Sequence, residues 1–167
     1  MRISKAKFAV LVAFSVIGLI TSAFVLWTWN IQRHSLPICT SSQPFFGLTI
    51  DCARVLGSPY STVFGIPLEA LAVAYFIANI LLVWLYAFAA DSRATQALRL
   101  LFFWRFLGLI LVPYLVFVEV VLLHAICVYC TTMHVMILAD FAVVSWFLFR
   151  NRGDQAPSEA AIEPPQH

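Results

Sequence analysis

The stretch "HAICVYCTTMH", residues 124–134, places two cysteines, Cys127 and Cys130, where a short turn meets a long apolar run. Residues three apart lie on one face of a helix, so both thiols are expected in the first turn of a helix that begins here. Unpaired N–H groups and the positive end of the helix dipole favour a thiolate there, and thiol pKa values in C-x-x-C motifs are commonly lowered. The motif therefore predicts a redox-active pair, with two buried packing cysteines as the alternative.

The composition indicates that most of this chain lies in lipid. Of its 167 residues, 62% are hydrophobic and 11% are charged, and the mean hydropathy is +0.92. A spanning helix needs about 20 apolar residues, and four such stretches occur, at roughly 8–27, 67–89, 100–123 and 128–149. The first is predicted to be a retained helix, because its apolar run is longer than that of a secretory signal peptide and no clear small-x-small cleavage site follows it before Trp27.

The basic residues predict the orientation of these four spans. An even number of spans puts both termini on one side, and that side carries eight Lys and Arg residues against two on the other. The eight are Arg2, Lys5, Lys7, Arg93, Arg99, Arg105 (low in its span and able to snorkel), Arg150 and Arg152, and the two are Arg33 and Arg54. Because basic residues concentrate in cytoplasmic loops, we expect cytoplasmic termini and all four cysteines on the extracytoplasmic side. Two cysteine pairs in an oxidising compartment favour disulfide chemistry.

The chain divides into a four-helix transmembrane domain over residues 1–150 and a cytoplasmic tail over 151–167. The tail is rich in polar residues and contains three prolines, so it is predicted to be disordered. The sequence has no internal repeat, no Gly-rich phosphate loop and no basic stripe, which argues against nucleic acid as a partner.

The outer loop between the first two spans is predicted to cap the bundle. Residues 48–56 are amphipathic and short, which suits a half-helix lying at the membrane interface, and Gly57 and Pro59 then oppose its continuation. Pro67 is tolerated in the first turn of the next span, and Phe64, where the loop returns to the bundle, offers a ring for stacking. The predicted fold is an all-α membrane protein, a four-transmembrane-helix bundle with an extracytoplasmic half-helix/loop cap.

A second cysteine pair in this loop strengthens the redox interpretation. Cys39 and Cys52 have twelve residues between them and form no close-spaced knuckle, so a zinc site with four converging ligands is disfavoured and no metal is predicted. On a mobile lid, the pair can exchange a disulfide with an external protein and then with the C-x-x-C. The electrons then need an acceptor within the bilayer, for which a lipid-soluble quinone is the simplest choice. Which loop cysteine meets Cys127 is left open.

Ionisable residues within the spans are functional by default. His134 lies four residues after Cys130 on the same helical face, where it can contact a quinone carbonyl or stabilise the thiolate, or simply bond a backbone carbonyl. Glu69 is nearest to the reactive end of the bundle. Asp140 has no obvious partner in the sequence. For both Glu119 and Asp140, packing or helix–helix hydrogen bonding is expected.

The order of the cysteines and their surroundings resembles a known family. Cys39 in the first outer loop precedes "DCARVLGSPYSTVFGIP", residues 51–67, and a late "CVYCTT", residues 127–132, opens the last helix. This pattern resembles the vitamin K epoxide reductase (VKOR) family over roughly residues 39–76 and 123–141. The loop pair comes first and the C-x-x-C second, the reverse of the order in the bacterial quinone-reducing DsbB family, and "FGIP" looks more like prokaryotic members than vertebrate ones.

The resemblance implies a role for each cysteine. Cys130 would face a quinone held inside the four-helix bundle, and Cys127 would exchange disulfides with a loop cysteine. Cys39 and Cys52 would form the shuttle pair that takes electrons from a thioredoxin-fold (DsbA-like) protein. Many bacterial members carry such a domain fused after the last helix, and since only the tail follows here, the partner is expected to be a separate protein.

The resemblance also implies quinone contacts. Ser58 and Phe64 match positions near the quinone head group, and His134 stands where the vertebrate pattern has a tyrosine. Together with Glu69, these residues form the predicted quinone site, for menaquinone, ubiquinone or vitamin K as co-substrate.

The function predicted from these observations is a quinone-dependent thiol oxidoreductase of a prokaryotic plasma membrane, which reoxidises an extracytoplasmic thioredoxin-fold protein and supports disulfide bond formation. Three alternatives stay open: a vitamin K epoxide or quinone reductase proper, a non-enzymatic tetraspan scaffold with structural disulfides, and the same enzyme inserted with the opposite orientation.

Overall fold

The computed structural model of the protein describes residues 5–45, 47–89 and 91–153. The tail predicted over 151–167 lies outside these residues from residue 154 onward, and its first three residues, 151–153, are helical instead of disordered.

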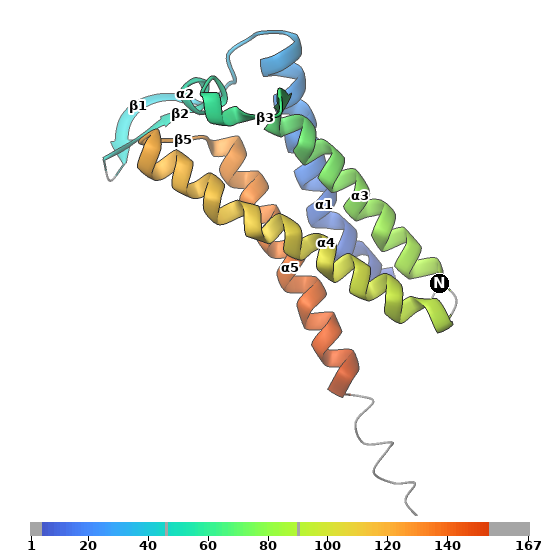
Figure 1. The fold of residues 1–167 in the computed structure, drawn as a ribbon. Coiled ribbons are helices and arrows are strands. Elements are labelled where there is room, and N and C mark those ends of the chain that lie inside the picture. Colours follow the sequence, from blue (N-terminus) through green and yellow to red (C-terminus); the bar gives the residue numbers. More distant parts are fainter. Residues whose placement is uncertain (1–4, 46, 90, 154–167) are drawn as a thin grey trace, which may run out of the picture.

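Four long helices form the body of the molecule: α1 (Lys5–Val25), α3 (Leu68–Phe88), α4 (Asp91–Phe117) and α5 (Val128–Gly153). Each contributes a segment long and apolar enough to cross a membrane, which confirms the predicted all-α four-helix membrane fold. In the bundle of Figure 1, α1 and α4 each pack against both α3 and α5.

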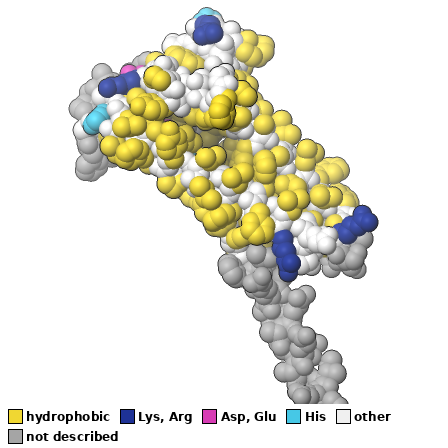
Figure 2. Space-filling view, viewed as in Figure 1, with side chains coloured by type: hydrophobic (Ala, Val, Ile, Leu, Met, Phe, Trp, Pro, Cys, Tyr) yellow, Lys and Arg dark blue, Asp and Glu magenta, His cyan; other side chains and the backbone are white. Residues whose placement is uncertain are grey.

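The outer surface of the bundle is apolar. Ile20, Leu81 and Phe103 are 64%, 63% and 65% exposed, and Figure 2 shows hydrophobic side chains over the helices with basic side chains near the two ends. Such a continuous apolar surface is stable only against lipid. The chain is therefore an integral membrane protein.

Two of the helices end in wider, π-helical turns, η1 (Leu26–Ile31) after α1 and η3 (Val118–Leu122) after α4. Both lie at the capped end of the bundle, opposite the N-terminal end of α1 (Figure 1). π-Helical turns are rare and occur frequently at functional sites, because the extra residue per turn redirects side chains.

The cap is built from short elements. They are β1 (Thr40–Phe45), β2 (Leu48–Asp51), α2 (Cys52–Leu56), the 3-10 turn η2 (Pro59–Ser61), β3 (Thr62–Val63), β4 (Ile66–Pro67) and, from the α4–α5 connection, β5 (Ala125–Ile126). The central strand β2 pairs antiparallel with β1 and parallel with β5. The cap is thus joined by backbone hydrogen bonds to the segment that leads into α5.

The half-helix predicted over residues 48–56 is present only in its second part. Residues 48–51 form strand β2, because their backbone groups pair with β1 and β5. The helix begins at Cys52, where the Asp51 side chain accepts a hydrogen bond from the Arg54 N–H at 3.0 Å and caps the first turn. The prediction was therefore wrong for residues 48–51 and correct for 52–56.

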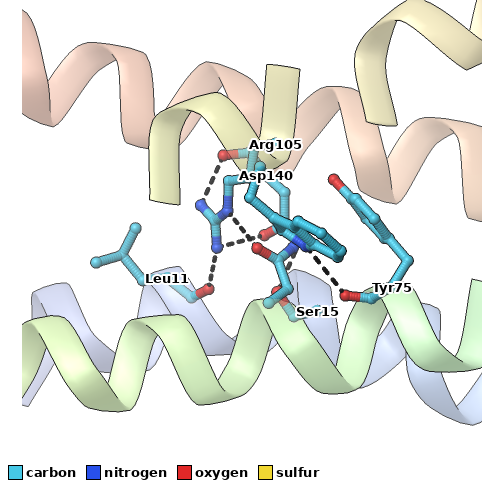
Figure 3. A network of polar contacts seen from close by, with 7 residues as sticks. Leu11, Ser15, Tyr75, Arg105 and Asp140 are labelled. Atoms are coloured by element: carbon cyan, nitrogen blue, oxygen red, sulfur yellow. Dashed lines mark hydrogen bonds and ion pairs between the residues drawn. The ribbon is translucent and has the colours of Figure 1, made fainter. Parts of the chain in front are cut away.

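A buried polar network joins all four helices inside the bundle (Figure 3). Arg105 pairs with the Asp140 carboxylate at 3.2 Å and donates to the backbone oxygens of Asp140 and Leu11 at 2.7 and 2.9 Å and to Asn79 Oδ1 at 3.0 Å. Asp140 also accepts from Ser15 Oγ at 2.7 Å and from Asn79 Nδ2 at 2.9 Å. Each of the three guanidinium nitrogens thus has a partner in the protein.

This network corrects one prediction and confirms another. Arg105 was predicted to snorkel to the membrane surface, but its side chain is completely buried because Asp140, on the neighbouring helix, neutralises it within the bundle. The helix–helix hydrogen bonding predicted for Asp140 is confirmed. Without Arg105, the charge bias behind the predicted orientation is seven basic residues against two.

Candidate active site

Three cysteine sulfurs meet beneath the cap. Cys39 and Cys52 are joined by a disulfide with their Cα atoms 5.5 Å apart, and the Sγ atoms of Cys39, Cys52 and Cys127 all lie within 4.8 Å of one another. The three residues are 3%, 1% and 0% exposed. Because disulfide exchange proceeds by direct attack of a thiolate on a disulfide sulfur, this arrangement brings the reacting atoms close together.

The cap strands account for this convergence. Cys52 directly follows β2 and Cys127 directly follows β5, and these two strands run parallel with Thr49 opposite Ala125 and Ile50 opposite Ile126. Two cysteines that follow paired parallel strands emerge side by side. The sequence alone did not predict this pairing, because β5 is only two residues long.

A hydrogen bond from Tyr129 holds the segment that carries Cys39 in place. Tyr129, between the two cysteines of the C-x-x-C, donates from its hydroxyl to the Pro37 carbonyl at 2.8 Å, two residues before Cys39. Its ring also packs against Phe24 of α1, with 5.7 Å between the ring centroids. The segment that carries Cys39 is thereby held on the start of α5.

The electrostatic surroundings stabilise the thiolate of Cys127. A hydrogen bond from the Cys130 side chain lowers the pKa of Cys127 below its usual range, against the opposing effect of burial. The Cys130 backbone N–H, 3.4 Å from Cys127 Sγ, acts in the same direction. This is the thiolate stabilisation expected at the start of a helix, and it falls on the cysteine that lies beside the disulfide.

On the other side of the C-x-x-C is a mostly apolar cavity of about 160 Å³, comparable to the roughly 150 Å³ that encloses a single benzene ring. Cys130 lines it, whereas Cys127 does not. The other walls come from α2, η2, α3, α4 and α5, and include Leu56, Tyr60, Leu71, Tyr75, Val112, Leu115 and Ile137. Cys130 thus lies between the other three cysteines and the cavity.

Three of the four predicted quinone contacts lie together in the wall of this cavity. Ser58, Glu69 and His134 line it with Cys130, and the Ser58 hydroxyl donates to the Val55 carbonyl at 2.8 Å. Phe64 does not join them: it is at the tip of the β3–β4 hairpin with φ +51°, and its ring is fully exposed. Its predicted stacking role stays a prediction.

Two polar residues that the sequence analysis did not place at the site also belong to it. Asn30, in the π-turn η1, donates to the Glu69 carboxylate at 3.4 Å. Glu119, in the π-turn η3, is buried, lines the cavity with Cys130, and interacts with the Cys130 side chain and the Cys127 backbone N–H. An apolar run does not reveal where a helix widens into a π-turn. The sequence signal for Glu119 was therefore only the free-energy cost of placing a carboxylate within a membrane span.

A four-helix membrane bundle with a capped disulfide beside a C-x-x-C pair defines a class of membrane protein suited to thiol–disulfide exchange. Comparison with protein families agrees: the sequence profile of the Vitamin K epoxide reductase family matches residues 9–145. The chain belongs to this family of oxidoreductases, as the order of its cysteines predicted. A search of curated proteins finds no match.

Proposed function

We propose that the protein is a quinone-dependent thiol–disulfide oxidoreductase that reoxidises an extracytoplasmic thioredoxin-fold protein and passes the electrons to a membrane quinone. The observation that carries this proposal is the position of Cys130. It lies in the wall of the cavity, and its partner Cys127 lies beside the Cys39–Cys52 disulfide. A purely structural disulfide would have no need of a free dithiol between it and a cavity.

The electrons would move in three exchanges. A reduced partner protein reduces the Cys39–Cys52 disulfide; the resulting dithiol reduces a Cys127–Cys130 disulfide; and the Cys127–Cys130 dithiol then reduces the quinone. Each exchange transfers two electrons, and the last consumes two thiol protons and yields quinol. In the second exchange a loop thiolate attacks the Cys127 sulfur, and Cys127 leaves as a thiolate when the Cys39–Cys52 disulfide closes, a step that its lowered pKa favours.

The cavity suits the ring of a quinone. It has about the volume of one aromatic ring, its walls are mostly apolar, and Ser58, Glu69 and His134 supply a few polar groups. Ligand sites of this kind combine apolar walls with a small number of polar contacts that fix orientation. We propose that these three side chains orient the carbonyl groups of menaquinone, ubiquinone or vitamin K.

The proposed location is a prokaryotic plasma membrane with cytoplasmic termini and the cap outside. The bias of seven basic residues against two supports this orientation. Burial of the disulfide adds a requirement: because Cys39 and Cys52 are 3% and 1% exposed, the cap must open before a partner protein can reach them. A membrane-impermeant maleimide, applied to intact cells after reduction, should label cysteines only if the cap is extracytoplasmic.

The proposed function is tested by donor oxidation in lipid nanodiscs. A reduced thioredoxin-fold protein is expected to be oxidised by the wild type only when quinone is present. The double variant C39A/C52A should lose this activity but still oxidise dithiothreitol, a small dithiol able to reach the C-x-x-C directly. Oxidation of the donor at equal rates with and without quinone would refute quinone dependence.

A further inference from the structure

Reduction of a quinone needs protons as well as electrons, and the site has few groups able to move them. When the Cys127 and Cys130 thiols form a disulfide, they release two electrons and two protons, and the quinone takes up the same number to become quinol. Cys127 is fully buried and the cavity walls are mostly apolar, so bulk water is poorly placed to take these protons. An internal base next to the thiols would solve the problem.

The titratable side chains around Cys130 come from several elements. Glu69 belongs to α3 and Glu119 to the π-turn η3, while Cys127 immediately precedes α5 and His134 lies within it. Tyr60 of η2 and Tyr75 of α3 line the same cavity. The base must be chosen among these groups.

Only one of the two carboxylates interacts with both cysteines of the C-x-x-C. Glu119 lines the cavity with Cys130 and interacts with the Cys130 side chain and the Cys127 backbone N–H. The side-chain hydrogen bond of Glu69 goes instead to Asn30. Glu119 therefore already occupies the position of a proton acceptor.

The fold holds Glu119 in place for this task. Its side chain is 6% exposed, and the wider turn of η3 aims it at the start of α5 and at the cavity. Its interaction with the Cys127 N–H keeps the carboxylate next to the C-x-x-C. A carboxylate that touches both the thiol and the cavity can take a proton from one and release it into the other.

We propose that Glu119 is the catalytic base of the last exchange: it takes the proton from the Cys130 thiol and returns it to the quinone oxygen as quinol forms. The inference rests on the proposed function, because it assigns the proton path of that reaction. The Cys127 proton is passed on in the same way when the Cys127–Cys130 disulfide closes, so the two thiol protons supply the two that quinol carries, and the carboxylate is regenerated after each transfer.

The test compares quinone reduction by purified wild type, E119Q, E119D and E69Q, with dithiothreitol as donor, between pH 5.5 and 9. General base catalysis typically contributes about 10²–10⁴-fold, so kcat of E119Q should fall about 100-fold or more near neutral pH with little change in KM. The defect should shrink as pH rises, since a thiol then loses its proton more readily without the help of a base. E119D should recover part of kcat, whereas E69Q, which alters the cavity wall, should change KM at every pH.

Several outcomes separate this inference from the function on which it rests. If the wild type reduces quinone and Cys130→Ser does not, but E119Q retains wild-type kcat, the inference is overturned and the proposed function stands. A kcat defect in E119Q of equal size at every pH would also overturn it, since that indicates a structural role. If E119Q does not fold, E119D decides: it must keep the wild-type pH profile with a reduced kcat. A folded wild type that reduces no quinone would remove both proposals.

Discussion

The hydrogen bond from Tyr129 to Pro37 should limit how often the cap opens, and its removal should increase the opened population by a predictable factor. Tyr129→Phe removes the hydroxyl that holds the Cys39 segment at 2.8 Å but keeps the ring that packs against Phe24. A hydrogen bond contributes about 0.5–1.5 kcal/mol net, which corresponds to a population of opened caps about 2- to 13-fold larger. The buried Cys39–Cys52 disulfide can be reduced by a bulky reagent only in that opened state.

The assay is the rate of disulfide reduction by a phosphine, followed by mass tagging of the freed thiols. Tyr129→Phe should accelerate reduction within the range given above. Tyr114→Phe, at an exposed position on the outer surface of α4, is the matched control and should leave the rate unchanged. Equal rates in wild type and Tyr129→Phe would refute the role of this bond, and acceleration in both variants would attribute the effect to the loss of any tyrosine hydroxyl.

Three further predictions follow from buried contacts. Arg105→Met leaves the Asp140 carboxylate unpaired in the bundle and should lower the free energy of unfolding by about 3–5 kcal/mol. The double variant Arg105→Met/Asp140→Leu should recover most of the lost stability, and thermal unfolding in detergent measures both effects. Cys130→Ala removes the hydrogen bond that lowers the Cys127 pKa, so alkylation of Cys127 should need a higher pH. Cys130→Ser keeps a donor and should shift the pH dependence of alkylation less. An unchanged pH dependence in Cys130→Ala would contradict the role of this hydrogen bond. Gly108→Ala would place a methyl group 2.5 Å from the Tyr75 hydroxyl, at the wall of the cavity, and should raise KM for quinone more than it lowers kcat; an unaltered KM would show that this part of the cavity is not occupied.

The spans and the cysteine chemistry could be predicted from the sequence because both depend on local patterns. The apolar runs marked all four helices, since lipid tolerates little else at that length, although α4 begins at Asp91, nine residues before the predicted start of its span. The spacing of Cys127 and Cys130 placed both thiols at the start of α5, where the structure has them. His134 was placed beside Cys130 by the same helical periodicity.

Features that depend on contacts between distant segments were not predictable in this way. Residues 48–51 are apolar enough for either a helix or a strand, and the choice is made by pairing with β5, more than 70 residues later in the chain. Arg105 and Asp140 each appeared unpaired along the sequence, although two opposite charges in adjacent spans are a signal that could have joined them. The contact of Glu119 with Cys130 depends on the π-turn η3, which apolar periodicity does not reveal.

The arrangement of the four cysteines has a consequence for how the protein would work. The disulfide and Cys127 are buried together under the cap, while Cys130 opens to the cavity. Exchange with an external partner and reduction of an acceptor in the membrane would therefore take place on opposite sides of the C-x-x-C. In the proposed function, such a separation would keep the partner protein and the quinone from reacting directly.

The most direct test of this account is quinol formation by the purified protein, with dithiothreitol as donor, for wild type and Cys130→Ser. The wild type should reduce quinone, and Cys130→Ser should not, even though its Cys39–Cys52 disulfide still forms and its fold is retained. Quinone reduction by Cys130→Ser at the wild-type rate would contradict the claim that electrons leave the protein through Cys130.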